Sequence, residues 1–178
     1  MVLHTRVLIV AIGLGTLGVF GAVVNHHLKS SDAALTRQFL AHRADFERIV
    51  GMANVDAHLT RIAPDFTWLD NNVAWPRGDI GISEQRWDEY KRLFRSVGAP
   101  VGIMHDLGTQ RVIIPLVDEG LVPSGWEKGI VYSPTPLSPV LHSLDKKPPD
   151  KLWDGPDRSH VLAYKQIEDH WYLYYEQW

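Results

Sequence analysis

The clearest fold signal in the chain is VLAYKQIEDHWYLYYEQW, residues Val161 to Trp178. Its two halves are rich in apolar and aromatic residues that favour strands, and Glu168–Asp169–His170 between them is typical of a tight turn. The pattern predicts a β-hairpin with strands at Val161–Ile167 and Trp171–Tyr175. Because apolar or aromatic side chains fall on both faces of these strands, we expect the hairpin to lie near the centre of a sheet.

Further strands are predicted upstream of this hairpin. Val101–Asp106 and Arg111–Val117 flank Leu107–Gly108–Thr109, which predicts a second hairpin. Pro115 cannot donate a hydrogen bond to a neighbouring strand, so the strand that contains it is predicted to lie at a sheet edge or to carry a bulge. The remaining predicted strands are Phe66–Leu69 and Lys128–Tyr132.

Two helices are predicted ahead of most of the strands. The first runs from about Asp32 to Met52, because its apolar residues recur at helical spacing and a pair of capping serines precedes it. The second begins after the capping residue Ser83 and ends at Gly98, since glycine is typical of helix C-termini. Helices segregated from antiparallel strands along the chain are typical of an α+β fold.

The N-terminal region carries the apolar segment VLIVAIGLGTLGVFGAVV, residues Val7–Val24, with Thr16 as its one polar side chain and no charge. As a helix it would be about 27 Å long, enough to cross a bilayer core when its flanks help. It is apolar on all sides, which is typical of a membrane helix. A cleaved signal peptide is the main alternative, but the length of the segment and the lack of a clear cleavage site favour an uncleaved anchor.

Small residues within this segment allow three interpretations. Gly13, Gly15 and Gly18 spell the G-x-G-x-x-G of dinucleotide-binding turns, but no strand ending in a ribose-binding acid follows them. Small residues on one helix face would let two membrane helices approach closely, or they would simply fill the segment. The residues that share this face are Ala11, Gly15, Gly18 and Ala22.

These segments predict four parts: a short tail at 1–6, a transmembrane anchor at 7–24, a juxtamembrane linker at 25–31 and one exported α+β domain at 32–178. The predicted fold is an N-terminal transmembrane helix followed by two helices packed on an antiparallel sheet of about four to six strands. The short tail favours an inside N-terminus. This predicts a single-pass protein of the bacterial inner membrane whose domain faces the periplasm or the cell exterior.

The composition excludes several classes of function. A formal charge of −3 gives no support for nucleic-acid binding, and the absence of cysteine excludes disulfides, thiol catalysis and thiolate metal sites. The nine histidines form neither H-x-H nor H-E-x-x-H, and no serine stands in a G-x-S-x-G elbow. We therefore predict neither a metal nor a cofactor. The sequence favours a protein that is not an enzyme, while an enzyme stays open.

A proline-rich segment, Ser133–Ser159, separates two predicted strands, and loops of this length are often functional. Large aromatic residues in or beside loops are frequent binding anchors, although they also cover the ends of small cores. The predicted contact residues are Trp126, Lys128, Trp153 and Asp154.

Three segments resemble a known group of proteins: ISEQRWDEYKRLFRSVG (82–98), GWEKGIVYSPTPLSPVLHSLD (125–145) and YKQIEDHWYLYYEQW (164–178). A W-x-x-Y-x-x-L-F helix, a K-G-x-x-Y strand and a terminal W-Y-L-Y hairpin are similar to the pattern of an uncharacterised family of bacterial membrane-anchored or exported proteins. The resemblance covers residues 83–178 and implies an envelope setting, with no activity attached to it.

The leading interpretation is a non-enzymatic, membrane-anchored envelope protein whose domain binds a protein or another envelope component. A first alternative is an envelope hydrolase that uses histidines and carboxylates gathered from loops. A second is a structural subunit of a membrane complex, assembled as a homo-oligomer through the small-residue face. The sequence leaves open the identity of the partner, the oligomeric state, the orientation and the cleavage of the apolar segment.

Overall fold

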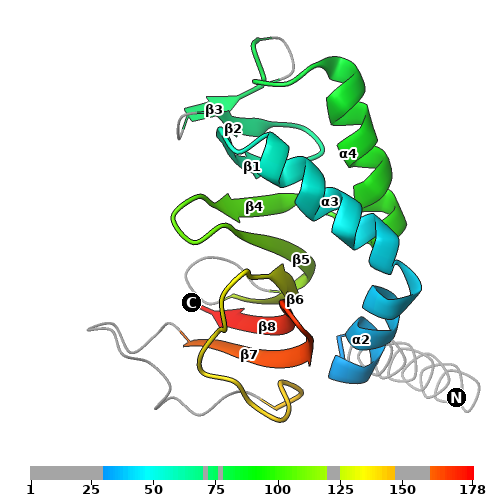
Figure 1. Ribbon diagram of the computed structural model, residues 1–178, viewed down its shortest axis with the longest axis vertical. Coiled ribbons are helices and arrows are strands. Elements are labelled where there is room, and N and C mark those ends of the chain that lie inside the picture. Colours follow the sequence, from blue (N-terminus) through cyan, green and yellow to red (C-terminus); the bar gives the residue numbers. More distant parts are fainter. Residues whose placement is uncertain (1–29, 70–71, 76–77, 120–124, 147–160) are drawn as a thin grey trace, which may run out of the picture.

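The structure is a computed structural model that describes residues 30–69, 72–75, 78–119, 125–146 and 161–178 (Figure 1). These residues hold three helices and eight strands. The helices are α2 (Asp32–Ala41), α3 (Arg43–Val55) and α4 (Glu84–Val97). The strands are β1 (Leu59–Ile62), β2 (Thr67–Leu69), β3 (Asn72–Ala74), β4 (Ile103–Asp106), β5 (Arg111–Glu119), β6 (Trp126–Tyr132), β7 (Val161–Glu168) and β8 (Trp171–Gln177).

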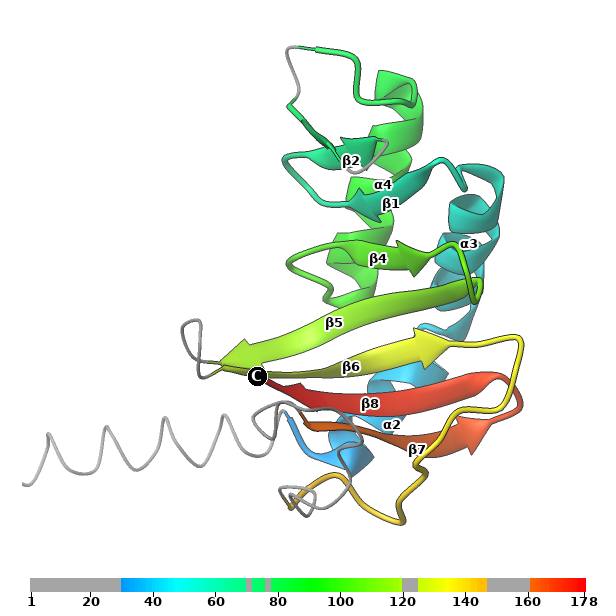
Figure 2. The same cartoon turned by 90° about the vertical axis from the view of Figure 1, so that its left-hand side faces the viewer.

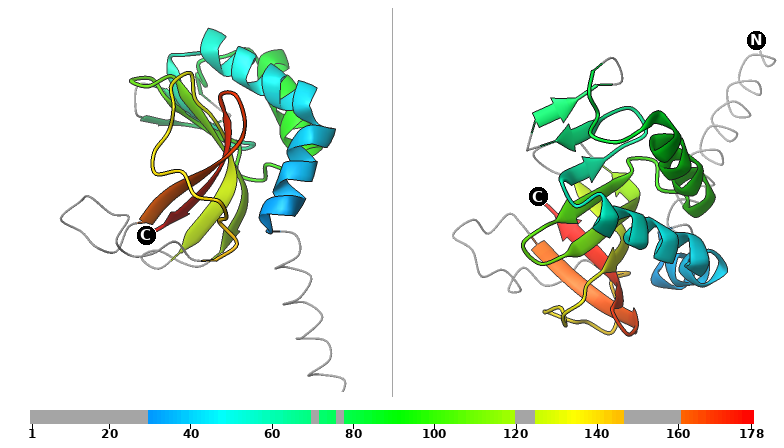
Figure 3. Two further views of the ribbon diagram at one scale, coloured as in Figure 1. Left: turned by 60° about the horizontal axis from the view of Figure 1, so that its bottom comes forward. Right: turned by 45° about the horizontal axis from the view of Figure 1, so that its top comes forward.

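The eight strands form one antiparallel sheet in the order β3-β2-β1-β4-β5-β6-β8-β7. Figures 2 and 3 show α2, α3 and α4 on a single face of this curved sheet, here called the helix face. Ile130 packs in the main core on that face, whereas Val131 packs against tyrosines on the opposite, outer face. Because side chains alternate along a strand, Trp126, Lys128 and Tyr132 share the helix face with Ile130.

The first predicted helix is in fact two helices, α2 and α3, which meet at His42. His42 has φ −119° and ψ 22°, and its N–H is shared between the carbonyls of Gln38 and Phe39. The break lets the chain follow the curved sheet. Phe39 of α2 and Phe46 of α3 therefore both pack against Trp171, with ring centroids 5.0 and 6.3 Å from that of the tryptophan. Neither proline nor glycine stands at the break, and for that reason the local sequence does not mark it.

Helix α4 matches its prediction at both ends. The Ser83 hydroxyl accepts a hydrogen bond from the Arg86 N–H at 3.2 Å, and Gly98 ends the helix with φ +70°. The Gln38 side chain of α2 donates to the Val97 carbonyl at 2.7 Å. Local capping therefore sets the ends of α4, and a contact from α2 ties its last turn to the neighbouring helix.

The predicted C-terminal hairpin is confirmed as β7 and β8, but its predicted place in the sheet is only half right. β8 lies inside the sheet between β6 and β7, whereas β7 is the last strand of the sheet. Tyr164 of β7 packs against Tyr172 on the outer face, with ring centroids 6.4 Å apart, and Leu137 packs against the same cluster. Cover from the 133–146 segment explains why an edge strand has apolar residues on both faces.

Pro115 lies at a bulge, which is one of the two predicted alternatives. The ladder between β5 and β6 shifts register between Pro115 and Val117, and Gly129 stands opposite Pro115. A Cβ on Gly129 would meet the Ile114 carbonyl oxygen at 2.2 Å, so a glycine is required where the strands come this close.

The predicted architecture, an N-terminal transmembrane helix, two further helices and a sheet of four to six strands, is wrong. The described residues hold three helices and eight strands, because the first helix is broken and because β1 and β3 join the sheet. These strands are 4 and 3 residues long, too short to show alternation, and they form by pairing with β2. None of the described helices is long and apolar enough to span a membrane. The segment 7–24, with Ala11, Gly15, Gly18 and Ala22, lies outside the described residues.

Candidate functional site

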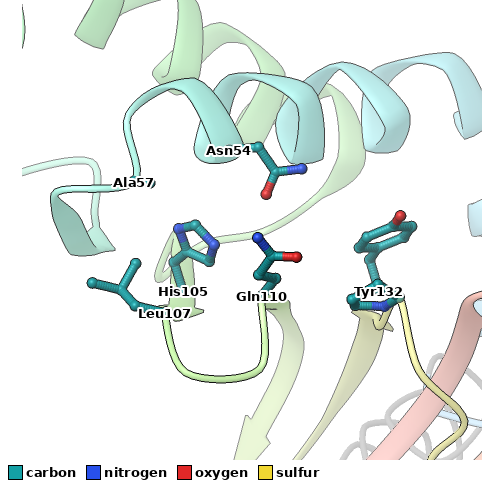
Figure 4. A pocket seen from close by; sticks show the side chains of 7 residues that line it. Asn54, Ala57, His105, Leu107, Gln110 and Tyr132 are labelled. Carbon is teal, nitrogen blue, oxygen red and sulfur yellow. The ribbon is translucent and has the colours of Figure 1, made fainter.

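A cavity of about 340 Å³ opens on the helix face, beside the C-terminal end of α3 and the ends of β4 and β6 (Figure 4). We call it the histidine pocket. The chain reaches it from three separate stretches. Residues 54–57 come from the end of α3 and the turn after it, whereas 105–110 and 132–134 become neighbours through the antiparallel pairing of β4, β5 and β6. Its lining residues are Asn54, Ala57, His105, Leu107, Gln110, Tyr132 and Pro134.

His105 is the most buried polar residue of this pocket. It lies on β4 opposite Val112, which belongs to the main core, and its exposed fraction is 5%. Neither ring nitrogen has a hydrogen-bond partner among the residues that the structure describes. A buried polar group left without a partner costs about 1–3 kcal/mol of stability. The protein therefore tolerates an unfavourable arrangement here, and such exceptions are frequent at functional sites.

The imidazole of His105 is neutral near pH 7. Burial lowers its pKa below the ordinary value, and the negative charge of Asp106 offsets this only in part. Asp106 follows His105 in the strand, so its side chain points to the outer face, where it pairs with Arg111. A neutral imidazole has one N–H donor and one acceptor nitrogen, and in His105 both nitrogens are buried behind the surface of the pocket.

The turn between β4 and β5, which carries two lining residues, is held by Asp106. Its carboxylate accepts hydrogen bonds from the Thr109 hydroxyl at 2.6 Å and from the Gly108 N–H at 3.0 Å, and it pairs with Arg111 at 2.8 Å. The bonds from Thr109 and Arg111 lower the pKa of Asp106 to about 2. The carboxylate thus stays charged at neutral pH and fixes the position of Gln110.

Gln110 adopts a backbone conformation that is unusual for its residue type. Its φ is +57°, in the left-handed region where glycine and asparagine are the favoured residues. Figure 4 shows the side chains of Asn54, His105 and Gln110 turned toward one another. This backbone conformation costs some stability, and it places the Gln110 side chain in the lining of the pocket.

Tyr132 forms the far wall of the pocket at the end of β6. Its ring packs edge-on against the ring of Trp171, with ring centroids 5.2 Å apart, and its centroid lies 6.0 Å from that of the His170 ring. These contacts fix the position of the ring beside the cavity (Figure 4). In the described part of the chain, the lining of this pocket contains polar and apolar groups but no charged one at pH 7.

The structure brings together two of the four predicted contact residues, at the opposite end of β6. Trp126 and Lys128 line a second cavity of about 420 Å³, where the ring of Trp126 stacks on that of Tyr175 at 5.9 Å. Trp153 and Asp154 lie outside the described residues, so their part in the predicted contact surface stays a prediction.

Lys128 is part of a buried ion cluster, which we call the lysine cluster and define as Asp32, Lys128, Asp145 and Lys165. Lys128 Nζ lies 2.6 Å from Asp32 Oδ1 and 3.0 Å from Asp145 Oδ1, and Lys165 Nζ lies 3.0 Å from Asp32 Oδ2. Lys128 is 2% exposed and Asp32 is 3% exposed. A lysine held by two carboxylates and hidden from solvent is a structural residue rather than a contact residue.

Backbone groups complete the lysine cluster. The Asp32 N–H donates to Asp145 Oδ1 at 2.6 Å, and the Leu144 N–H donates to Asp32 Oδ2 at 2.9 Å. Burial by itself would raise the pKa of Asp32, but hydrogen bonds from Lys128, Leu144 and Lys165 lower it to about 2. The cluster therefore ties the start of α2 to β6, to β7 and to the 133–146 segment.

Among the described residues, the other histidines lie outside any metal-binding group, and His42 lies beside a serine. No group of three or more histidine and carboxylate side chains within the described ranges could hold a metal ion. Ser96, Asp45 and His42 meet beside α3, but the Ser96 hydroxyl donates to Asp45 rather than to the imidazole. His142 is exposed. A serine whose proton is held by a carboxylate is not activated by the histidine as a nucleophile.

Sequence reasoning missed the histidine pocket. Asn54 lies in a helix, Gln110 in a turn and Tyr132 at a strand end, and no motif links them. One sequence feature could have pointed to it: His105 stands in a predicted strand at a position that alternates with outward residues, which places a polar ring on the buried face.

Comparisons with known proteins assign no family to this geometry. No family model matches the sequence, no curated protein matches it, and no solved structure matches the fold. The resemblance to membrane-anchored or exported bacterial proteins stays a prediction. Function is therefore inferred from the site alone.

Proposed function

We propose that the protein is a membrane-attached envelope protein whose α+β domain binds an envelope component in the histidine pocket and carries out no chemistry on it. The carrying observation is His105, which is buried at the base of the pocket with both ring nitrogens unpaired among the described residues. Both nitrogens are buried behind the surface of the cavity, so a ligand that turns the ring and hydrogen-bonds to it would recover the cost of burying it.

Binding is favoured over catalysis by the lining of the pocket. Hydrolysis by a protein site needs a nucleophile, an acid or base near a reacting atom, or a metal. Among the residues described, those that line the pocket include no carboxylate, serine or lysine. His105 could accept a proton, but no described lining residue could act as its nucleophilic or acidic partner.

Attachment to the envelope is supported by the sequence of residues 7–24. This apolar segment precedes the domain by a few polar residues, and α2 begins at Asp32. The lysine cluster bonds the start of α2 to β6 and β7, so a domain held at a membrane through residues 7–24 would be held at a point that is bonded to the sheet.

The pocket is tested on the full chain, purified in a detergent without a sugar headgroup and labelled with ¹⁵N at histidine. The His105 resonance is assigned from its absence in His105→Gln, and low-mass fractions of native envelope extract are then added. We expect at least one fraction to shift the His105 resonance while that of exposed His142 stays in place. If every fraction leaves His105 unmoved in a folded chain, the pocket is not the binding site.

Attachment is tested separately by fractionation of cells that make the full chain or a chain without residues 7–24. The full chain should sediment with membranes and resist extraction with alkaline carbonate. The shortened chain should be released. Release of the full chain by carbonate would contradict the attachment.

A further inference from the structure

We infer that the ligand of the histidine pocket is a neutral saccharide, held by its hydroxyl groups. This inference rests on the proposed function and names the ligand class of the same site. It follows from three properties of the pocket: its charge, its hydrogen-bonding groups and its size.

The charge of the lining disfavours ions. Burial keeps His105 uncharged, and the other polar lining residues in the described ranges are amides and a phenol. The nearest acid in sequence, Asp106, turns to the outer face and is already paired with Arg111. A carboxylate, phosphate or ammonium ligand would lose its hydration without gaining an opposite charge.

The hydrogen-bonding groups disfavour an apolar ligand and suit hydroxyls. An apolar group against His105 would leave both of its nitrogens unpaired and buried. The amides of Asn54 and Gln110 and the hydroxyl of Tyr132 each offer both a donor and an acceptor, and the buried imidazole would add its own once the ring turns. A sugar hydroxyl also donates and accepts, so neighbouring hydroxyls of one sugar ring can satisfy several of these groups together.

The apolar part of the lining suits the carbon skeleton of a sugar. The ring of Tyr132 and the side chains of Leu107 and Pro134 lie around the same cavity as the polar groups. Aromatic rings pack against the C–H faces of pyranoses because both surfaces are flat and apolar. A cavity of about 340 Å³ lies at the small end of ligand sites, which fits a free sugar or the end of a glycan better than the middle of a long polymer.

The inference is tested by calorimetric titration of the full chain in a detergent without a sugar headgroup. The neutral probes are glucose, galactose and N-acetylglucosamine, and the charged probes of similar size are glucosamine and glucuronate. We expect at least one neutral probe to bind at least 10-fold more tightly than both charged ones. Short neutral glycan chains are added as a further arm, because tighter binding of a chain than of its free end sugar identifies a glycan as the source.

Two variants and one control keep the result interpretable. His105→Leu and Asn54→Ala should each weaken binding of the neutral probe by at least 10-fold and 3-fold, respectively. His142→Leu removes an exposed histidine and should leave binding unchanged. Unchanged binding in His105→Leu and Asn54→Ala would place the bound sugar outside the pocket and overturn the inference. An equal loss of affinity in all three variants, the control included, would overturn it as well.

The outcomes separate the ligand class from the proposed function. If envelope fractions shift the His105 resonance but no neutral sugar or glycan binds, the saccharide is wrong and the binding pocket stands. Tighter binding of glucosamine or glucuronate than of the neutral sugars would contradict the inference that the ligand is uncharged. If neither sugars nor envelope fractions affect His105, the proposed function fails together with the inference.

Discussion

At both ends of β6 a polar group is buried on the helix face. At one end this group is paired within the protein, and at the other end it is not. At one end Lys128 is surrounded by Asp32 and Asp145, and its charge is balanced within the protein. At the other end Tyr132 borders a pocket in which His105 is buried with no partner for its nitrogens among the described residues. Burial is similar, at 2% exposure for Lys128 and 5% for His105.

This difference between Lys128 and His105 suggests separate roles for the two ends of β6, one in stability and one in binding. A buried charge whose partners all come from the protein holds elements together and has little left to offer a ligand. A buried neutral group without a partner destabilises the fold by about 1–3 kcal/mol, and a ligand that reached it would recover part of that cost. We therefore expect substitutions at the lysine cluster to change stability and substitutions at the histidine pocket to change binding.

The largest expected effect comes from Lys128→Met. It leaves one oxygen of buried Asp32 without its cation and removes the ion pair to the exposed Asp145, and we expect a loss of about 3 kcal/mol in the free energy of unfolding. Urea denaturation of the full chain measures it. The matched control, Lys165→Met, removes a lysine whose side chain is 31% exposed and leaves Lys128 in place, so it should cost less. A stable Lys128→Met protein that no longer binds would reverse the comparison.

Acid should lower the free energy of unfolding through the two sites in different pH ranges. The folded pKa of Asp32 is about 2 against an ordinary value of 3.8, so its contribution of about 2 kcal/mol is present above pH 4 and is lost as pH falls toward 2. The folded pKa of His105 is also lowered, here from 6.5, so stability begins to fall already below that pH.

Urea midpoints measured from pH 8 to pH 3 check both ranges. His105→Leu should remove the part of the slope that begins near pH 6.5, and Asp32→Asn should flatten the part below pH 4. An unchanged slope in His105→Leu would mean that the pKa of His105 is the same in the folded and the unfolded protein.

His105→Leu is expected to separate binding from stability. The leucine fills similar space and removes two unpaired buried nitrogens, so the free energy of unfolding should stay the same or rise at pH 8. Binding of the envelope ligand should weaken by at least 10-fold, about 1.4 kcal/mol. His105→Gln restores a donor and an acceptor and should regain part of the affinity. A clear loss of stability in His105→Leu would show that the ring has a structural role.

The smallest expected effect is that of Gln110→Gly. Glycine adopts the observed φ of +57° without strain, so we expect stability to rise by about 1 kcal/mol or less. Loss of the amide should weaken ligand binding several-fold. Gln110→Asn is the control, because asparagine accepts the same backbone conformation and keeps a shorter amide. Unchanged binding in both variants would remove Gln110 from the site.

Local sequence predicted the elements whose causes are local. The Ser83 cap, the Gly98 end of α4 and the turn between β7 and β8 depend on residues a few positions apart, and all three are found. The break at His42 and the short strands β1 and β3 were beyond such reasoning. They form because the curved sheet and its neighbouring strands stabilise them, and nothing within a few residues marks them.

By itself the sequence determined the helix caps, the C-terminal hairpin, the lack of cysteine chemistry and the presence of an apolar segment at 7–24. The packing of distant elements places Lys128 between Asp32 and Asp145 and leaves both ring nitrogens of His105 buried without a partner among the described residues. The Lys165–Asp32 bond joins residues 133 positions apart. Whether a polar side chain is satisfied depends on which distant partner folding places beside it, and that partner cannot be identified from the residues next to it in the chain.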